Sequence, residues 1–139
     1  MNAIDTNIWI YCHDRRVPKK QAIARSVVEE ARPLALIWQV GCEFIAASRK
    51  LVDSGFSEQE AWDALDDMKS MADLIVLPDV TVWTEARRLY ATHSLSFWDA
   101  LLLAACVRAG LEALYSEDIS DGFEVNGVKV INPFAGWDS

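Results

Sequence analysis

Short apolar runs alternate with longer segments of helical pattern along almost the whole chain, and this alternation restricts the fold more than any other feature. Alternating strands and helices predict a parallel sheet whose two faces are covered by helices. We therefore expect an α/β fold of three layers, with a central, mainly parallel sheet of about four or five strands. The expected strands cover residues 3–4, 34–37, 73–77, 112–115 and 129–131, and the expected helices cover 6–13, 18–32, 38–52, 57–71, 79–93 and 97–109.

Capping residues support several of these helix boundaries. Pro18 fits the first turn of a helix, where its missing N–H costs no hydrogen bond. Ser57 with Glu60 three residues later forms the pattern of a capping box. Gly55 and Gly110 end the helices that precede them.

The size and composition of the chain indicate one folded domain. We expect a single domain over residues 1–139, because 139 residues is an ordinary domain length and 52% hydrophobic residues argue against disorder. The longest strongly apolar stretch, ALLLAACV at 100–107, is too short to span a bilayer. No basic segment followed by an apolar core marks the N-terminus as a signal peptide. We therefore expect a cytoplasmic protein with no membrane partner.

The charge of the chain is strongly negative. Thirteen basic and 21 acidic residues give a net charge of −8, which argues against tight sequence-independent binding of nucleic acid. Either the acids solvate the surface, or some of them bind divalent cations and so reverse the local charge. Cys12, Cys42 and Cys106 are widely spaced and form no CxxC pair, so we expect them to be small buried hydrophobes.

Four acids occupy positions at which a parallel sheet would bring side chains together. Asp5 directly follows the first expected strand, and Asp118 lies just past the strand that ends near Tyr115. Sites in such folds form beyond the carboxyl ends of the strands. Asp99 begins an inward-facing stripe of its helix, and Glu43 lies on a helical stripe flanked by apolar residues.

Each acid also has an ordinary structural explanation. Asp5 is a good helix N-cap, Asp99 completes a capping box with Ser96, Glu43 can extend to water, and Asp118 lies in an acidic turn. Together they favour a metal site, because converging carboxylates repel one another unless a cation neutralises them. Oxygen ligands without a His or Cys partner suit Mg²⁺ or Mn²⁺.

Several motifs make the chain resemble the PIN-domain family, and most closely the small VapC-like toxins of bacterial toxin–antitoxin pairs. The motifs are DTNIWIY at 5–11, the helical Glu43, SFWDALLLAA at 96–105, LYSED at 114–118 and the ending VNGVKVINPF at 125–134. The resemblance covers nearly the whole chain. It implies a PIN-like fold and a metal-dependent ribonuclease that is often dimeric and is silenced by an antitoxin protein.

The resemblance also implies roles for particular residues. Acids matching Asp5, Glu43, Asp99 and Asp118 surround one or two divalent ions in that family, and Thr6, Asn7, Ser96 and Ser116 match its supporting polar positions. Glu117 and Asp121 lie in the same loop as Asp118, so the choice among these three acids stays open. The implied products carry 5′-phosphate and 3′-hydroxyl ends, which fits attack by an activated water.

RNA, whether tRNA or mRNA, would have to be bound by local positive charge. The loop HDRRVPKK at 13–20 brings Arg15, Arg16, Lys19 and Lys20 close in sequence to Asp5. We prefer this loop as the RNA contact, with an antitoxin contact or a simply solvated loop as the alternatives.

Three other functions fit parts of the pattern. A receiver-like signalling domain also places acids at strand ends, but a Lys usually follows its late strand, and here Ser116 and acids follow it. A PIN-fold nuclease outside any toxin pair and a non-catalytic PIN-fold binding protein would each share the fold. The intact set of four acids argues against the non-catalytic alternative.

Overall fold

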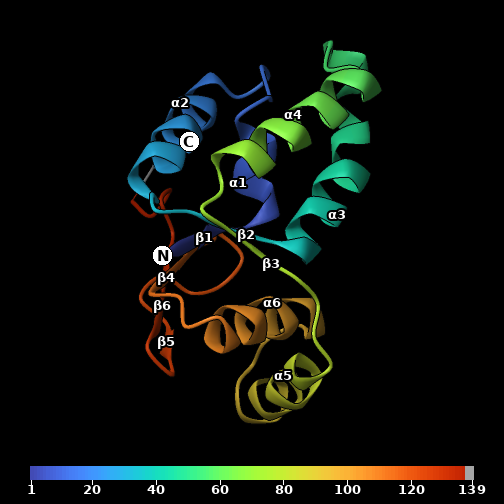
Figure 1. The fold of residues 1–139 in the computed structure, drawn as a ribbon. Helices are drawn as coiled ribbons and strands as arrows, with labels where there is room; N and C mark the ends of the chain where they lie inside the picture. Colours follow the sequence, from blue (N-terminus) through green and yellow to red (C-terminus); the bar gives the residue numbers. More distant parts are fainter. Residues whose placement is uncertain (137–139) are drawn as a thin grey trace.

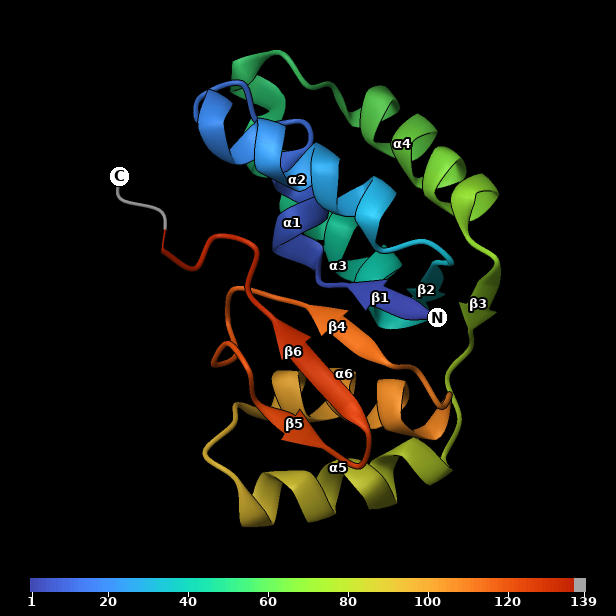
Figure 2. The ribbon, with the colours of Figure 1, turned by 90° about the vertical axis from the view of Figure 1, so that its left-hand side faces the viewer.

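A central sheet with helices on both faces forms the body of the molecule, as the computed structural model of residues 1–136 shows (Figure 1; Figure 2). Its strands follow the order β1-β4-β6-β5. The first three run parallel, and β5 pairs antiparallel with β6. The predicted α/β class and the mainly parallel sheet are therefore confirmed. The strands are β1 (Asn2–Ile4), β4 (Ala113–Tyr115), β5 (Glu124–Val125) and β6 (Val128–Ile131).

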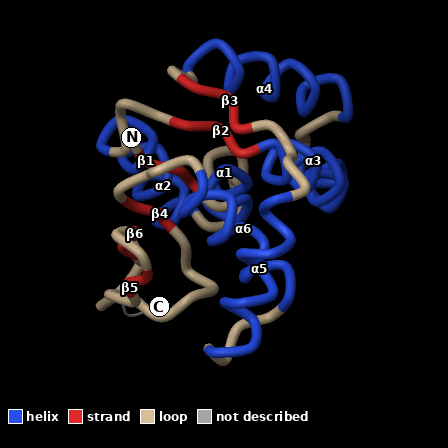
Figure 3. The backbone as a smooth tube through the Cα atoms, turned by 60° about the horizontal axis from the view of Figure 1, so that its bottom comes forward, coloured by secondary structure: helices blue, strands red, loops and turns tan. Residues whose placement is uncertain are grey.

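A second, two-stranded ladder extends the sheet beyond β1. Strand β2 (Ala35–Ile37) pairs parallel with β3 (Leu74–Val76). A single bridge between Asn2 and Leu34 joins this ladder to β1. Figure 3 shows β3 and β2 lying beside β1, so that the strands follow one another across the molecule. The carboxyl ends of β1, β2 and β4 consequently point to the same edge.

The helices divide between the two faces of the sheet. Helices α1 to α4 lie on one side, and α5 packs on α6 on the other (Figure 2). No helix among residues 1–136 is both long and apolar enough to cross a membrane. The bounds are α1 (Thr6–Tyr11), α2 (Pro18–Glu30), α3 (Trp38–Ser48), the 3₁₀ helix η1 (Arg49–Ser54), α4 (Glu58–Met71), α5 (Thr81–Thr92) and α6 (Phe97–Arg108).

The core fills the space between the sheet and both helical layers. Ile4 of β1, Ile8 of α1, Leu114 of β4 and Leu103 of α6 are essentially inaccessible to water. Burial of such side chains contributes about 1.5–3 kcal/mol each, which holds the strands rigidly on the helices. The strand ends that carry the candidate acids are therefore fixed from both sides.

Two sequence predictions about secondary structure need correction, and one hairpin was not predicted. The helix expected over 38–52 ends at Ser48 and continues as η1, and Gly55 stops it with φ of 93°. The hairpin of β5 and β6 was not expected, although its turn holds Asn126 and Gly127 with positive φ, the pattern of a tight hairpin. The apolar residues at 73–77 favour a buried strand, but β3 is an edge strand and Ile75 is 41% exposed.

The cysteines divide into two groups. Cys12 and Cys106 are buried, as expected of small hydrophobes. Cys42 is exposed, so that expectation is wrong for this residue, which lies on the outer surface of α3 beside an open groove.

Candidate metal centre

Asp5 is positioned by three backbone and side-chain contacts at the end of β1. Its backbone N–H donates to the carbonyl of Tyr115 across the parallel pair of β1 and β4, at 2.8 Å. Its carboxylate caps α1 by accepting a hydrogen bond from the N–H of Thr6 at 2.7 Å. The hydroxyl of Ser116 donates to the other carboxylate oxygen at 2.8 Å. Asp5 is only 6% exposed, so it is held in one place and largely cut off from water.

Asp99 enters the same region from the first turn of α6. Ser96 caps this helix by accepting a hydrogen bond from the N–H of Asp99 at 3.1 Å. Asp118, in the loop after β4, accepts hydrogen bonds from the side-chain amide of Asn7 at 3.1 and 3.4 Å. One carboxylate oxygen from each of Asp5, Asp99 and Asp118 lies within 4.8 Å of the other two. We call these three side chains the acid cluster.

The acid cluster is electrostatically unfavourable without a cation. Burial, opposed by the hydrogen bonds from Ser116 and Thr6 and reinforced by the charges of Asp118 and Asp99, raises the pKa of Asp5 from 3.8 to about 6. Burial and the neighbouring charges of Asp99 and Glu117 also raise the pKa of Asp118. None of the ion pairs formed among residues 1–136 includes a carboxylate of the cluster. The donor set, three carboxylates with no nitrogen or sulfur, therefore fits a hard divalent ion such as Mg²⁺ or Mn²⁺.

Glu43 lies at the rim of the acid cluster. The hydroxyl of Thr6 donates to its Oε1 at 3.2 Å, and the side-chain amide of Gln39 donates to the same oxygen at 3.3 Å. The structure thus brings Glu43 next to the other predicted acids, and neither of these two donors occupies its second oxygen. A cavity of about 140 Å³ is lined by Asp5, Thr6, Asn7, Gln39, Glu43, Ala47, Trp98, Asp99, Leu102 and Asp118.

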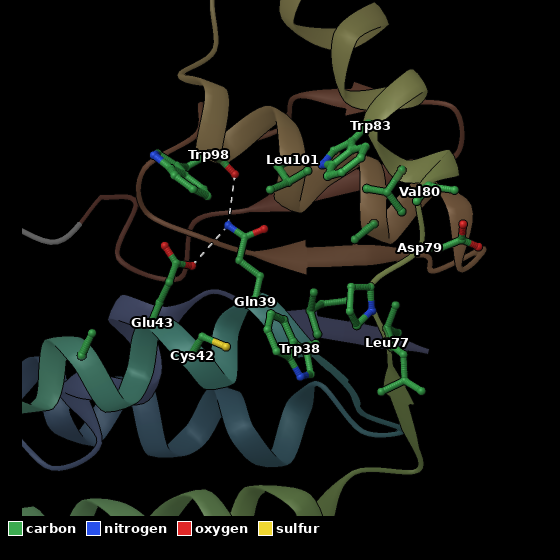
Figure 4. Close-up of a pocket in the computed structure, with 16 residues that line it drawn as sticks. Trp38, Gln39, Cys42, Glu43, Leu77, Asp79, Val80, Trp83, Trp98 and Leu101 are labelled. Carbon is green, nitrogen blue, oxygen red and sulfur yellow. Dashed lines mark hydrogen bonds between the residues drawn. The ribbon is translucent and has the colours of Figure 1, made fainter.

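Gln39 is a residue of this site that the sequence analysis missed. Its amide donates to Glu43 and to the backbone carbonyl of Trp98, at 3.3 Å each, and so connects α3 to α6 (Figure 4). Its spacing of one helical turn before Glu43 was the available signal, because such residues face the same side of a helix. The contact to Trp98 depends on tertiary packing alone.

The structure also separates the three acids of the loop after β4. Asp118 lies in the acid cluster, whereas Glu117 accepts a hydrogen bond from the hydroxyl of Tyr11 and pairs with Lys20. Asp121 accepts a hydrogen bond from the N–H of Asn132 at 2.8 Å. Of the three, only Asp118 shares the cavity with Asp5 and Asp99.

The basic residues considered for RNA binding lie in the segment from the end of α1 to the start of α2. Arg15, Arg16 and Lys19 are exposed. The guanidinium of Arg16 binds both carboxylate oxygens of Asp14 at 2.9 Å. Lys20 is partly buried and pairs with Glu117 at 3.2 Å. Arg16 and Lys20 therefore each pair with an acid of this chain, although Arg16 remains on the surface together with Arg15 and Lys19.

An apolar groove adjoins the acid cluster. It has a volume of about 730 Å³ and shares Gln39, Glu43 and Trp98 with the acidic cavity. Trp38 at the start of α3, Trp83 on α5 and Trp98 on α6 line it and are 53%, 65% and 61% exposed. Figure 4 shows these indole rings around the opening between α3 on one side and α5 with α6 on the other.

Fold and site together define an α/β domain with a carboxylate cluster at the carboxyl ends of its parallel strands. The sequence profile of the PIN domain matches residues 3–123. Since this match covers most of the chain, the protein belongs to the PIN domain family.

Two solved structures resemble the fold closely. One is a chain of a toxin–antitoxin complex from Klebsiella pneumoniae, with 24% identity and a TM-score of 0.70 over 96% of this chain and 98% of that chain. The other is Mycobacterium tuberculosis VapC20, a toxin that cleaves the sarcin–ricin loop, with 16% identity and a TM-score of 0.61 over 82% and 87% of the two chains. A search of curated protein sequences finds no match. At these identities the likeness establishes a common fold.

Proposed function

We propose that this protein is a Mg²⁺- or Mn²⁺-dependent endoribonuclease and the toxin of a bacterial toxin–antitoxin pair. The observation that carries the proposal is the acid cluster, in which oxygens of Asp5, Asp99 and Asp118 lie within 4.8 Å of one another in a PIN domain. Both structural neighbours come from toxins or toxin complexes, and one of them cleaves RNA. These likenesses support the same activity here.

Each residue of the site has a defined part in the proposed reaction. Asp5, Asp99 and Asp118 hold one or two divalent ions, which would activate water and stabilise charge on the phosphoryl oxygens. Glu43 orients or deprotonates the attacking water through the oxygen that Thr6 and Gln39 leave uncommitted. Ser116, Thr6 and Asn7 orient the carboxylates by hydrogen bonds, and Ser96 fixes the helix turn that presents Asp99. In this proposal water attacks phosphorus and the bond to the 3′ oxygen breaks, so that the products carry a 5′-phosphate and a 3′-hydroxyl.

RNA binding in this proposal relies on the exposed cations near α2. Arg15, Arg16 and Lys19 lie on the surface of a protein that is otherwise strongly acidic. Contacts between such side chains and phosphates are screened by salt, so binding should weaken steeply as salt rises. The substrate class is RNA, either tRNA or mRNA.

The apolar groove is our candidate surface for the antitoxin. A monomer rarely exposes three indoles around one opening, and a protein partner would bury them. Glu43 and Asp79 also line the groove, which favours a partner segment with apolar side chains and nearby basic residues. Such a segment would cover Glu43 and Trp98 and so obstruct the acidic cavity. A homodimer is part of the same proposal, and light scattering of the purified chain measures it directly.

The deciding experiment incubates the purified protein with end-labelled RNAs, a tRNA pool included, in Mg²⁺, Mn²⁺ or EDTA. Asp5→Asn and Asp99→Asn serve as site variants. Cleavage that requires metal and is lost in both variants supports the proposal. Cleavage that persists in the variants identifies a contaminating nuclease and contradicts the assignment of the site.

Two further results separate the alternatives. Metal binding without cleavage of any RNA favours a non-catalytic PIN-fold binding protein. Metal-dependent cleavage by a protein whose gene has no small antitoxin gene beside it favours a PIN nuclease that acts outside a toxin pair.

A further inference from the structure

A contact network at the edge of the core ties the loop after β4 to helices α1 and α2. The hydroxyl of Tyr11 donates to Oε1 of Glu117 at 2.5 Å. The ammonium of Lys20 lies 3.2 Å from Oε2 of Glu117 and donates to the Tyr11 hydroxyl at 3.2 Å. We call these three residues the Tyr11–Lys20–Glu117 clasp. The ring of Phe134 closes it, edge-on to Tyr11 at 5.3 Å.

The clasp holds Glu117, which precedes Asp118 of the acid cluster in the chain. Asn7 and Tyr11 are one helical turn apart on α1, so their side chains lie on the same face. Asn7 binds Asp118, and Tyr11 binds Glu117. One face of α1 therefore holds two consecutive acids of the loop, each through its own hydrogen bond.

Asp118 needs such external support more than the other two members of the cluster. Asp5 is a buried helix cap, and Asp99 belongs to the first turn of a helix. Asp118 is exposed and lies in a loop outside any helix or strand. Within that loop, its N–H donates to the hydroxyl of Ser116 at 3.2 Å. The position of its carboxylate thus depends on what fixes Glu117 and Ser116.

The ion pair between Lys20 and Glu117 is well suited to holding Glu117 in one position. The side chains of Lys20 and Glu117 are only 20% and 18% exposed, so water and salt screen the pair less than a surface pair. The ammonium also lies 4.6 Å from the ring centre of Tyr11 and 5.0 Å from that of Phe134, within the range of cation–π attraction. Several weak contacts converge on one lysine and hold Glu117 away from the acid cluster.

We propose that the Tyr11–Lys20–Glu117 clasp positions Asp118 for divalent-metal binding, with Glu117 as a positioning residue and not a ligand. This inference rests on the proposed metal-dependent function. It gives Lys20 a role in positioning Asp118, in place of the RNA contact suggested by its sequence position.

The test measures Mn²⁺ binding to the RNA-free protein, so that any contact of these residues with RNA does not enter. The variants are Lys20→Met, Tyr11→Phe and Lys20→Arg, and Lys69→Met is the matched control because Lys69 forms an ion pair with Asp66 on α4. Circular dichroism and a thermal melt establish that each variant is folded at the temperature of the measurement. The free Mn²⁺ concentration is read by electron paramagnetic resonance.

For Lys20→Met, a positioning role and simple electrostatics predict opposite changes in the affinity for Mn²⁺. Removal of the ammonium leaves the charge of Glu117 unpaired beside the cluster, which by itself would tighten Mn²⁺ binding. Loss of positioning weakens it, and we expect the Kd to rise about 10-fold, the low end of the range for groups that orient metal ligands. We expect a similar rise for the charge-neutral Tyr11→Phe, near-normal binding for Lys20→Arg and for Lys69→Met, and recovery of RNA cleavage in Tyr11→Phe at saturating Mn²⁺.

The outcomes separate this inference from the proposed function. If the wild type binds Mn²⁺ and cleaves RNA while Lys20→Met and Tyr11→Phe bind Mn²⁺ as tightly or more tightly, the clasp has no positioning role. If the wild type itself binds no Mn²⁺, the metal-dependent function fails, and the clasp inference fails with it.

Discussion

Asp5 caps helix α1 and also belongs to the acid cluster. Burial of its ionised carboxylate destabilises the fold when no metal is bound. The carboxylate is 6% exposed, and its pKa is raised to about 6. A raised pKa means that the folded protein prefers the protonated acid. Asp5 therefore stabilises the fold below pH 4, and this contribution is lost as the pH rises through about 6.

Asp5→Asn should therefore stabilise the metal-free protein at pH 8 while abolishing metal binding. Asparagine keeps the capping oxygen without the buried charge. The rise in the pKa from 3.8 to about 6 corresponds to about 3 kcal/mol, and we expect a gain of about 1–3 kcal/mol in the free energy of unfolding. Urea denaturation at pH 8 and pH 4 measures it, and the gain should shrink at pH 4.

Asp79→Asn is the control for this substitution. Asp79 accepts a hydrogen bond from the N–H of Thr81 near the start of α5, and this bond lowers its pKa. The same chemical change should bring no gain in stability there. Equal gains in stability for both variants would contradict the view that the gain comes from removing the buried charge of Asp5.

Gln39 offers a second test at the scale of one side chain. Gln39→Leu keeps the size of the residue but removes the hydrogen bonds to Glu43 and to the carbonyl of Trp98. We expect the cleavage rate at saturating Mn²⁺ to fall about 10-fold, because Glu43 loses one of its two orienting donors. Gln59→Leu, which removes a hydrogen bond to Asp63 on α4, should leave the rate unchanged.

At the scale of the element, the start of α6 links helix stability to the site. Ser96 caps α6 through the N–H of Asp99, and Ser57 caps α4 through the N–H of Glu60. Ser96→Ala and Ser57→Ala should each cost about 1 kcal/mol in the free energy of unfolding. Only Ser96→Ala should also raise the Kd for Mn²⁺, because it loosens the turn that presents Asp99. Equal Mn²⁺ affinities of the two variants would show that the cap serves stability alone.

Helix α1 shows why elements in this protein depend on their neighbours. It has six residues, and helices this short are unstable in isolation. Its hydrophobic residues Ile8, Trp9 and Ile10 are buried, and Asp5 caps its first turn. Tertiary burial therefore maintains the helix from which Asn7 and Tyr11 reach the loop of Asp118.

At the scale of the whole molecule, metal binding should control thermal stability in a pH-dependent way. A ligand at about 100 times its Kd stabilises the folded state by about 2.7 kcal/mol. We expect Mn²⁺ to raise the Tm by roughly 8–12 °C at pH 7.5 for a domain of this size. The rise should be smaller at pH 5, because the pKa of Asp5 near 6 lets protons compete with the ion.

Differential scanning fluorimetry with Mn²⁺, with Mg²⁺ and with EDTA measures this effect. Asp99→Asn should show no rise at either pH. A rise of equal size at pH 5 and pH 7.5 would contradict the participation of Asp5 in binding.

The sequence by itself determined the order of the elements and the identity of the acids near strand ends and helix starts. Alternating apolar and helical patterns are local features, so they reveal the α/β class and the parallel sheet without long-range information. The positions of Asp5 after β1 and Asp99 after Ser96 follow from the same local signals. The Asn-Gly turn before β6 was also present in the sequence and would have predicted the hairpin.

Only the tertiary structure decided which of these acids meet and what holds them. Asp5, Asp99 and Asp118 lie far apart in the chain, and their convergence depends on the pairing of β1 with β4 and on the packing of α6. The separation of Asp118 from Glu117 depends on Tyr11 and Lys20, which come from other helices. Contacts of this kind have no local sequence pattern, because they arise from the distances between elements that are brought together only when the core is packed.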